Sequence, residues 1–183
     1  LDVHAETIAV ALAEPGRGEV RSLGIIANEP TAIRKLIQKL GKKHLRVCYE
    51  AGPTGFALYW QLAELGVECD VIAPTLIPKK AGDRIKTDRR DALKLARCFR
   101  AGDLTAVWVP DQAHEALRDL VRAREAAKYD HHRAKQRLSK FLLRSAKKPP
   151  SGCSAWSQKY VEWIRTLQYD HVAQQATLVD YLA

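Results

Sequence analysis

Residues 45–73, LRVCYEAGPTGFALYWQLAELGVECDVIA, decide the fold class of this chain. The run LRVCY at 45–49 is short and apolar and leads into Glu50 and a Gly/Pro turn, which is typical of a buried strand. Residues 56–65 follow as a helix that ends at a glycine, and 67–73 form a second strand that ends at a proline. Strand, helix and strand in this order predict an α/β domain.

The residues before this stretch extend the sheet. TIAVAL at 7–12 is rich in β-branched residues and enters a turn that contains glycine and proline, so it predicts one strand of a hairpin with 19–27 as its partner. The start of the chain is the tail of an earlier strand, which places Asp2 at a strand end. Residues 31–40 form an amphipathic helix. Because the chain begins at Leu1 and contains no methionine, we expect its natural start and the rest of that first strand to lie upstream.

The residues after this stretch become helical. DRRDALKLARCFRAGD at 88–103 has helical spacing and a glycine stop, and the strand-like TAVWVP follows at 105–110. We therefore predict an α/β domain over residues 1–110, with a mixed sheet flanked by helices, and a helical extension over 111–183.

One long helix is expected at 111–146, because this stretch contains neither glycine nor proline. Its seam residues alternate steps of four and three, as in a coiled coil. The partner helix is either 154–183 of the same chain or a second copy, and we favour the second copy, which makes the chain a homo-oligomer. The seam consists of Ala113, Leu117, Leu120, Arg124, Ala127, His131, Ala134, Leu138 and Phe141.

The charge balance favours a nucleic-acid partner. Lys and Arg number 30 against 21 Asp and Glu, for a net charge of +9, and the basic residues gather beside the 88–103 helix and along 131–148. No stretch resembles a membrane span or a signal peptide, so we expect a cytoplasmic protein without a membrane partner. The four cysteines lack zinc or disulfide spacing and are expected as buried thiols. The nucleic-acid-binding candidates are Arg84, Lys86, Arg89, Arg90, Arg133, Lys135, Arg137, Lys140 and Arg144.

Four carboxylates occupy the positions that a two-metal site needs. Asp2 and Glu50 fall at strand ends, where ligands gather in open α/β sheets. Asp88 and Asp91 are three residues apart at a helix start, so they share one face. Such oxygen ligands suit Mg²⁺ or Mn²⁺ and phosphodiester chemistry. His4 has no partner at metal-ligand spacing in the sequence, so we did not expect it in the site.

Three strings resemble the DEDD transposases of bacterial insertion sequences, the insertion-sequence one-ten family. They are LDVHAETIAVAL at 1–12, YEAGPTGFALYWQL at 49–62 and IPKKAGDRIKTDRRDALKLARCFRAGDLTAVWVPD at 77–111. The resemblance implies a RuvC-like, RNase H-type fold, in which Asp2, Glu50 and the pair Asp88 and Asp91 are the catalytic DEDD set that holds Mg²⁺. It also implies a second, C-terminal transposase domain with a nucleophilic serine, for which this chain has no counterpart.

By this resemblance, the expected function is that of the N-terminal catalytic half of a DNA transposase, with Mg²⁺-dependent cleavage and strand exchange. The family is also described as working in oligomers with a structured non-coding RNA, so we expect DNA and such an RNA as partners. Two alternatives stay open. One is a Holliday-junction-type endonuclease that needs no second domain, and the other is a non-catalytic nucleic-acid-binding dimerisation module.

Overall fold

A three-stranded antiparallel sheet opens the chain. Strands β1 (Asp2–Val3), β2 (Thr7–Ala13) and β3 (Val20–Ala27) pair in that order in the computed structural model, which describes residues 1–78 and 87–182. The hairpin predicted between β2 and β3 is confirmed, and a bulge after Val10 shifts its register. A bulge of this kind increases the local twist of a hairpin. The pairing of β1 with β2 brings Asp2 opposite Ala9.

The strand–helix–strand prediction is also confirmed. Strands β4 (Arg46–Glu50) and β5 (Glu68–Ile72) are parallel neighbours, and α2 (Ala57–Glu64) connects them and packs against β5. The backbone nitrogen of Leu1 donates a hydrogen bond to the carbonyl of Cys48 at 2.7 Å, so the start of β1 lies beside β4. The strand that carries Asp2 is therefore a neighbour of the strand that carries Glu50.

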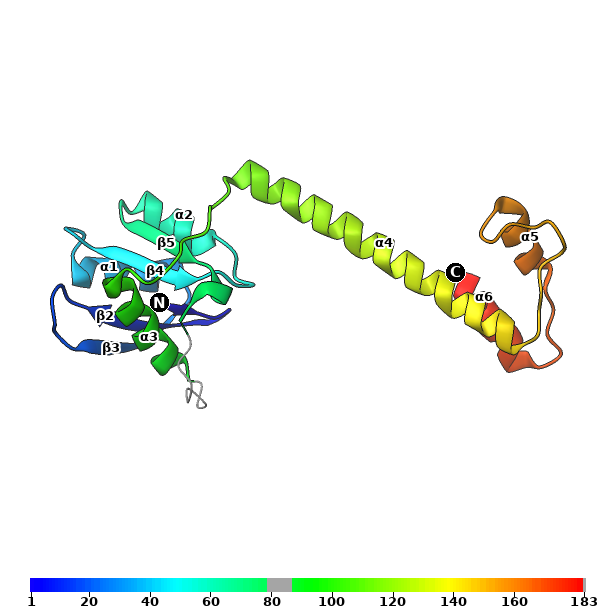
Figure 1. Cartoon of the computed structure of the whole chain (residues 1–183), viewed down its shortest axis with the longest axis horizontal. Coiled ribbons are helices and arrows are strands. Elements are labelled where there is room, and N and C mark those ends of the chain that lie inside the picture. The colour runs from blue at the N-terminus through cyan, green and yellow to red at the C-terminus, as the bar shows by residue number, and fades with distance from the viewer. Residues whose placement is uncertain (79–86, 183) are drawn as a thin grey trace. The chain divides into compact units, whose positions relative to one another are not determined.

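Two further helices pack against these strands. Helix α1 (Pro30–Leu40) contacts β3, and α3 (Asp88–Ala101) contacts β1, β2 and β3, as Figure 1 shows. The Thr87 hydroxyl caps the start of α3 by accepting a hydrogen bond from the backbone of Arg90. Gly102 ends the helix in the left-handed region at φ 79°, where glycine carries no steric penalty. The expected glycine stop is confirmed, and the buried residues Ala92, Leu95 and Ala96 mark the face of α3 that meets the sheet.

These elements belong to the first of two compact units, Leu1–Val109, called unit 1 here. Its core lies between the strands and helices α1 and α2, and Tyr49, Ile8 and Leu62 are fully buried. Burying such side chains is worth about 1.5–3 kcal/mol each. The core therefore fixes the strand ends that carry Asp2 and Glu50.

The strand expected at 105–110 is not formed as predicted. In the part of the chain that the structure describes, this stretch makes one isolated antiparallel bridge, between Ala106 and Ile72. Two backbone hydrogen bonds accompany it, from Val107 to the carbonyl of Val71 and from Ala73 to the carbonyl of Thr105. Val107 packs on the core, but Trp108 is 70% exposed. A pairing partner on one side only, and Pro110 at its end, leave this segment as an extended edge rather than a strand.

The second unit, Pro110–Ala183 or unit 2, is helical. It contains α4 (Gln112–Arg144), α5 (Gln158–Thr166) and α6 (Val172–Leu182). The Asp111 carboxylate caps α4 by accepting a hydrogen bond from the His114 backbone at 2.8 Å. The last turns of α4 pack against α5 and α6 around one small apolar core. That core consists of Leu138, Phe141, Leu142, Tyr160, Ile164 and Leu178.

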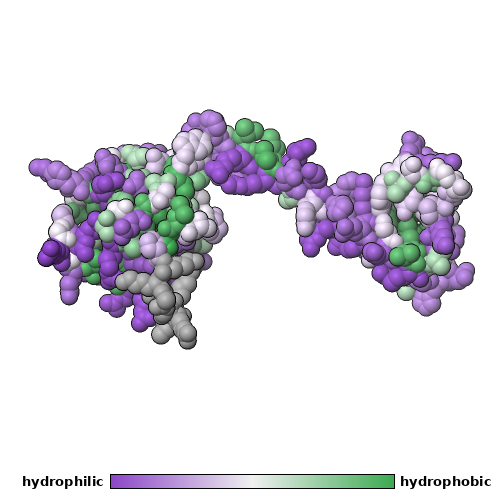
Figure 2. Space-filling view, viewed as in Figure 1, coloured by the Kyte–Doolittle hydropathy of each residue, from purple (hydrophilic) through white to green (hydrophobic). Residues whose placement is uncertain are grey.

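The predicted seam of α4 divides into two parts. Its last residues, Leu138 and Phe141, are buried against α5 and α6, so residues 154–183 cover this half within the same chain. Its first half is exposed instead: Leu117 is 58% and Leu120 68% accessible, and the neighbouring Val121 is 51% accessible. Figure 2 shows this apolar patch over the first turns of α4.

In the described residues, no helix combines the length and apolar character that crossing a membrane requires.

Candidate metal centre

Asp2, His4 and Asp88 come together at the end of β1. The Nε2 atom of His4 lies 3.3 Å from Asp2 Oδ2 and 3.5 Å from Asp88 Oδ1. One ligand atom from each residue falls within 4.8 Å of the other two. Asp2 is 15% exposed, whereas His4 and Asp88 are about half exposed, so the group opens to solvent on one side. Two carboxylates and an imidazole at this spacing can share a cation.

The backbone around His4 is held on both sides. The His4 N–H donates to the carbonyl of Thr7, and the His4 carbonyl accepts from Asn28 Nδ2, both at 2.8 Å. The Asn28 backbone also donates to Glu6 at 2.8 Å, which closes the turn between β1 and β2. Asn28 therefore positions the segment that carries Asp2 and His4, a role that its place just after β3 did not indicate.

Glu50 reaches the same region from β4. It lines a cavity of about 540 Å³ together with Asp2, His4 and Asn28. The backbone that follows Glu50 turns sharply, and Ala51 still donates to the carbonyl of Ile72 on β5. Among the described residues, Glu50 is not a member of the tighter group of Asp2, His4 and Asp88. The structure thus places it on the cavity wall, next to that group rather than within it.

Asp88 and Asp91 both lie in the first turn of α3, where backbone N–H groups favour negative charge. Asp88 is exposed and joins the group around His4. Asp91 is half-buried, and its Oδ2 atom is shielded from solvent without a hydrogen-bond partner among the described residues. A buried carboxylate oxygen normally has a partner. Among the described residues, however, Asp91 is not a member of the group around His4.

Sequence spacing indicated no metal-ligand partner for His4, but the structure places it beside Asp2 and Asp88. Its contact with Asp88 comes from α3, far along the chain, and the alignment of a strand end with a helix start cannot be read from sequence spacing. One local signal was available, because Asp2 and His4 are two apart and residues i and i+2 face the same side of an extended segment.

The basic residues beside the acids differ in exposure and in contacts. Arg84 and Lys86 lie outside the described residues. Arg89 and Arg90 are exposed next to Asp88 on the first turn of α3. Arg100, also on α3, donates to the backbone carbonyls of Glu14 and Gly18, so it holds the β2–β3 turn. Arg89 and Arg90 therefore lie next to the acids and are candidates for phosphate contact.

The basic residues of α4 form an exposed surface. Arg133, Arg137, Lys140 and Arg144 are exposed, and Lys135 is half-buried with its ammonium 5.2 Å from the centre of the Trp156 ring. No acidic side chain lies between 131 and 148 in the sequence. This density of unopposed positive charge is typical of a surface that binds phosphates.

The four cysteines are free thiols, but only Cys48 is buried as expected. Cys69, Cys98 and Cys153 are half-buried, so the expectation of buried thiols was wrong for these three. Burial raises the pKa of Cys48, and it raises the pKa of Cys69 to about 12. Both thiols therefore stay protonated at neutral pH and are poor metal ligands.

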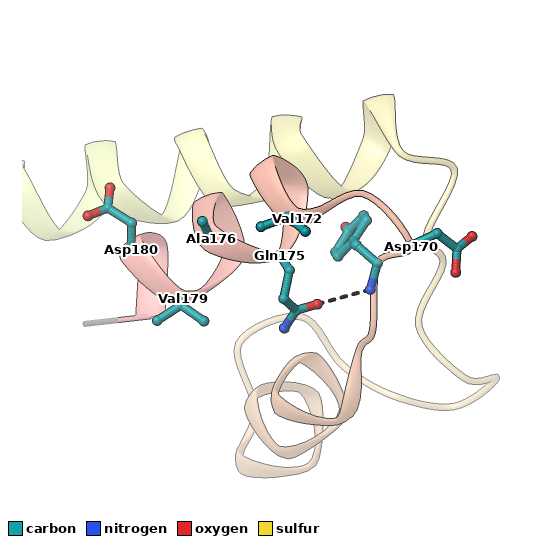
Figure 3. Close-up of a pocket in the computed structure, with 7 residues that line it drawn as sticks. Asp170, Val172, Gln175, Ala176, Val179 and Asp180 are labelled. Carbon is teal, nitrogen blue, oxygen red and sulfur yellow. Dashed lines mark hydrogen bonds between the residues drawn. The ribbon is translucent and has the colours of Figure 1, made fainter.

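A second cavity, of about 600 Å³, lies within unit 2 (Figure 3). Val172, Ala176 and Val179 line it from one side of α6, and the Gln175 side chain accepts a hydrogen bond from the Tyr169 backbone at 2.9 Å. Its two carboxylates, of Asp170 and Asp180, stand at opposite ends in Figure 3. This lining suits apolar packing, so the chemistry of the chain is better placed in unit 1.

Comparison with known proteins identifies the family. A family model described as a transposase, that of the DEDD transposases of the IS110 type, matches residues 1–146. A protein of Sinorhizobium fredii named as a transposase, y4qE, is 48% identical over 181 residues, which cover 97% of this chain and 46% of that protein. The transposase for insertion sequence element IS1533 of Leptospira borgpetersenii is 38% identical over 184 residues, covering 99% of this chain and 53% of that protein.

No solved structure matches the chain significantly. The chain spans about half the length of these two curated relatives. The family match includes all four acids of the predicted set and the whole of α4. The chain therefore belongs to the IS110 family of DEDD transposases.

Proposed function

We propose that this chain is the N-terminal catalytic half of an insertion-sequence transposase, and that it holds the divalent metal used to cleave and join DNA. The observation that carries the proposal is the convergence of acids from three elements. Asp2 on β1 and Asp88 on α3 lie within one ligand group, and Glu50 on β4 shares a cavity with Asp2. A divalent cation bound between these carboxylates would offset their mutual repulsion.

The donor set fits a hard divalent cation. Asp2, Glu50, Asp88 and Asp91 offer only carboxylate oxygens, the ligands that Mg²⁺ and Mn²⁺ prefer. The buried Oδ2 atom of Asp91, which lacks a partner among the described residues, supports the same reading, because binding a cation would satisfy it. We assign these four side chains as the residues that would hold Mg²⁺ or Mn²⁺.

When bound there, the metal would activate an attacking oxygen and stabilise the leaving oxygen of a phosphodiester. The protein would supply the rest. Arg89 and Arg90 sit one and two residues after Asp88 and would attract the DNA backbone toward the acids. The half-exposed side of the group, at His4 and Asp88, leaves room for a phosphate to approach.

The arrangement of unit 1 supports an RNase H-like fold for this half. Three antiparallel strands are followed by two parallel strands, and the start of β1 lies beside β4. The candidate acids come from the ends of β1 and β4 and from a helix packed on the first sheet. A RuvC-like nuclease domain of the kind implied by the sequence needs this convergence.

Unit 2 is proposed to bind nucleic acid and to join two copies of the chain. Its basic surface on α4 would contact phosphates of DNA or of a structured non-coding RNA, since both present the same backbone charge. The exposed seam residues Leu117 and Leu120, together with the neighbouring Val121, would pack against the same patch of a second copy.

The test uses the complete transposase that contains this chain, with its insertion-sequence ends on a plasmid. Asp88→Asn and Asp91→Asn should each abolish recombination in Mg²⁺ while leaving DNA binding within about threefold. The exposed Asp103, just past α3, offers a matched control, and Asp103→Asn should keep full activity. Recombination that survives in both acid variants would refute the catalytic role and favour a non-catalytic binding module. Cleavage of four-way junctions without joining would favour the junction endonuclease.

A further inference from the structure

The imidazole of His4 lies between two of the proposed metal ligands. Its Nε2 atom is 3.3 Å from Asp2 and 3.5 Å from Asp88, and no other nitrogen belongs to this group in the described part of the chain. Two carboxylates hold the same nitrogen from different elements, β1 and α3. If the two acids shared a cation, the His4 imidazole would be close enough to bind the same ion.

The spacing agrees with coordination of a single ion. Metal–ligand bonds of ~2.1 Å at right angles place neighbouring ligand atoms ~3.0 Å apart, and opposite ligand atoms ~4.2 Å apart. The two separations from His4 exceed the first of these values by a few tenths of an ångström, and the whole group lies within 4.8 Å. Small side-chain rotations would therefore complete the geometry without moving the backbone.

The backbone is already fixed in a suitable position. Hydrogen bonds at 2.8 Å hold both the N–H and the carbonyl of His4, through Thr7 and the Asn28 side chain. A ligand whose backbone is held in this way loses little conformational entropy when it binds.

We propose that His4 Nε2 is a direct ligand of the divalent ion and that it shifts the preference of the site from Mg²⁺ toward Mn²⁺. The inference rests on the proposed metal site of this transposase. Carboxylates suit both ions, but imidazole is a softer ligand that first-row transition metals accept better than Mg²⁺ does, although Mn²⁺ has the lowest affinity among those metals. One nitrogen among oxygen ligands therefore raises the Mn²⁺ affinity selectively.

Pulsed electron paramagnetic resonance of the 183-residue chain with Mn²⁺ alone tests the coordination directly. A bound imidazole nitrogen produces nitrogen modulation of the Mn²⁺ echo, which should be present in the wild type and absent in His4→Gln. The exposed histidine His131 on α4 provides the matched control, and His131→Gln should keep the modulation. Bound Mn²⁺ without nitrogen modulation in the wild type would overturn the proposal.

Calorimetric titration with Mn²⁺ and Mg²⁺ tests the preference. His4→Gln should weaken Mn²⁺ binding by about tenfold and Mg²⁺ binding by less than about threefold, with circular dichroism confirming the fold. An equal loss for both ions, or none, would overturn the inference and leave the four-acid site standing. A wild-type chain that binds neither ion would refute both this inference and the proposed metal site.

Discussion

Changing two leucines on the exposed half of the α4 seam should separate the chain into monomers. Leu117 and Leu120 are three residues apart on one helical face and are 58% and 68% exposed. Full burial of a leucine is worth about 1.5–3 kcal/mol, so covering these partly exposed side chains contributes roughly 1–2 kcal/mol each. A symmetric dimer contains each residue twice, which brings their joint contribution to roughly 4–8 kcal/mol.

Leu117→Asp with Leu120→Asp should therefore weaken association on the order of a thousandfold or more. Multi-angle light scattering at tens of micromolar should show a dimer for the wild type and a monomer for the double variant. The control is Leu143→Asp, because Leu143 is 68% exposed on the same helix but outside the seam. It should leave the dimer intact.

A third variant separates association from folding. Leu138 is 3% exposed and belongs to the core of unit 2, so Leu138→Asp should unfold that unit rather than only break a dimer. The reasoning is refuted if the wild type is monomeric at these concentrations, or if the dimer persists when both Leu117 and Leu120 are Asp.

Three further perturbations have defined outcomes. Phe141→Ala removes a ring that is 6% exposed and whose centre lies 5.2 Å from that of Tyr169. It should lower the free energy of unfolding of unit 2, measured by circular dichroism, by about 3–5 kcal/mol. A loss below about 1 kcal/mol would contradict the packing of this core. Changing Arg137, Lys140 and Arg144 together to Gln should reduce the slope of log affinity against log salt concentration for duplex binding by about 2–3. Fluorescence anisotropy measures this slope, and an unchanged slope would exclude these phosphate contacts. The hydrogen bond from the His114 backbone lowers the pKa of Asp111. The cap therefore stabilises the first turn of α4 fully above the ordinary aspartate pKa of about 3.9, and this stabilisation is lost as the pH falls through the lower folded-state pKa. Helicity that is insensitive to acid in both the wild type and Asp111→Asn would contradict this.

Local signals explain how much of the fold could be predicted from sequence. The helix that ends at Gly102 and the hairpin between β2 and β3 follow from stop and turn residues that act within a few positions. The stretch 105–110 has the residue types of a strand, yet it lacks a second neighbour to pair with, and pairing is a property of the whole sheet.

In the candidate site, too, residues whose positions depend on nearby sequence could be predicted, whereas residues whose contacts depend on packing between distant segments could not. Asp2 and Glu50 could be placed at strand ends because burial patterns define those ends, and Asp88 at a helix start because Thr87 caps it. The role of His4 depends on how α3 packs on β1, and the role of Arg100 depends on the path of the β2–β3 turn. Neither packing arrangement has a sequence signature.

The central claim is that four carboxylates from separate elements hold a divalent ion. Calorimetric titration of Mg²⁺ into the 183-residue chain tests it most directly, with Asp2→Asn, Glu50→Gln, Asp88→Asn and Asp91→Asn measured beside the control Asp103→Asn. We expect one or two ions per wild-type chain, binding weakened at least tenfold in each of the four variants, and an unchanged isotherm for the control. Wild-type binding that survives in all four variants, or that falls equally in the control, would contradict the account.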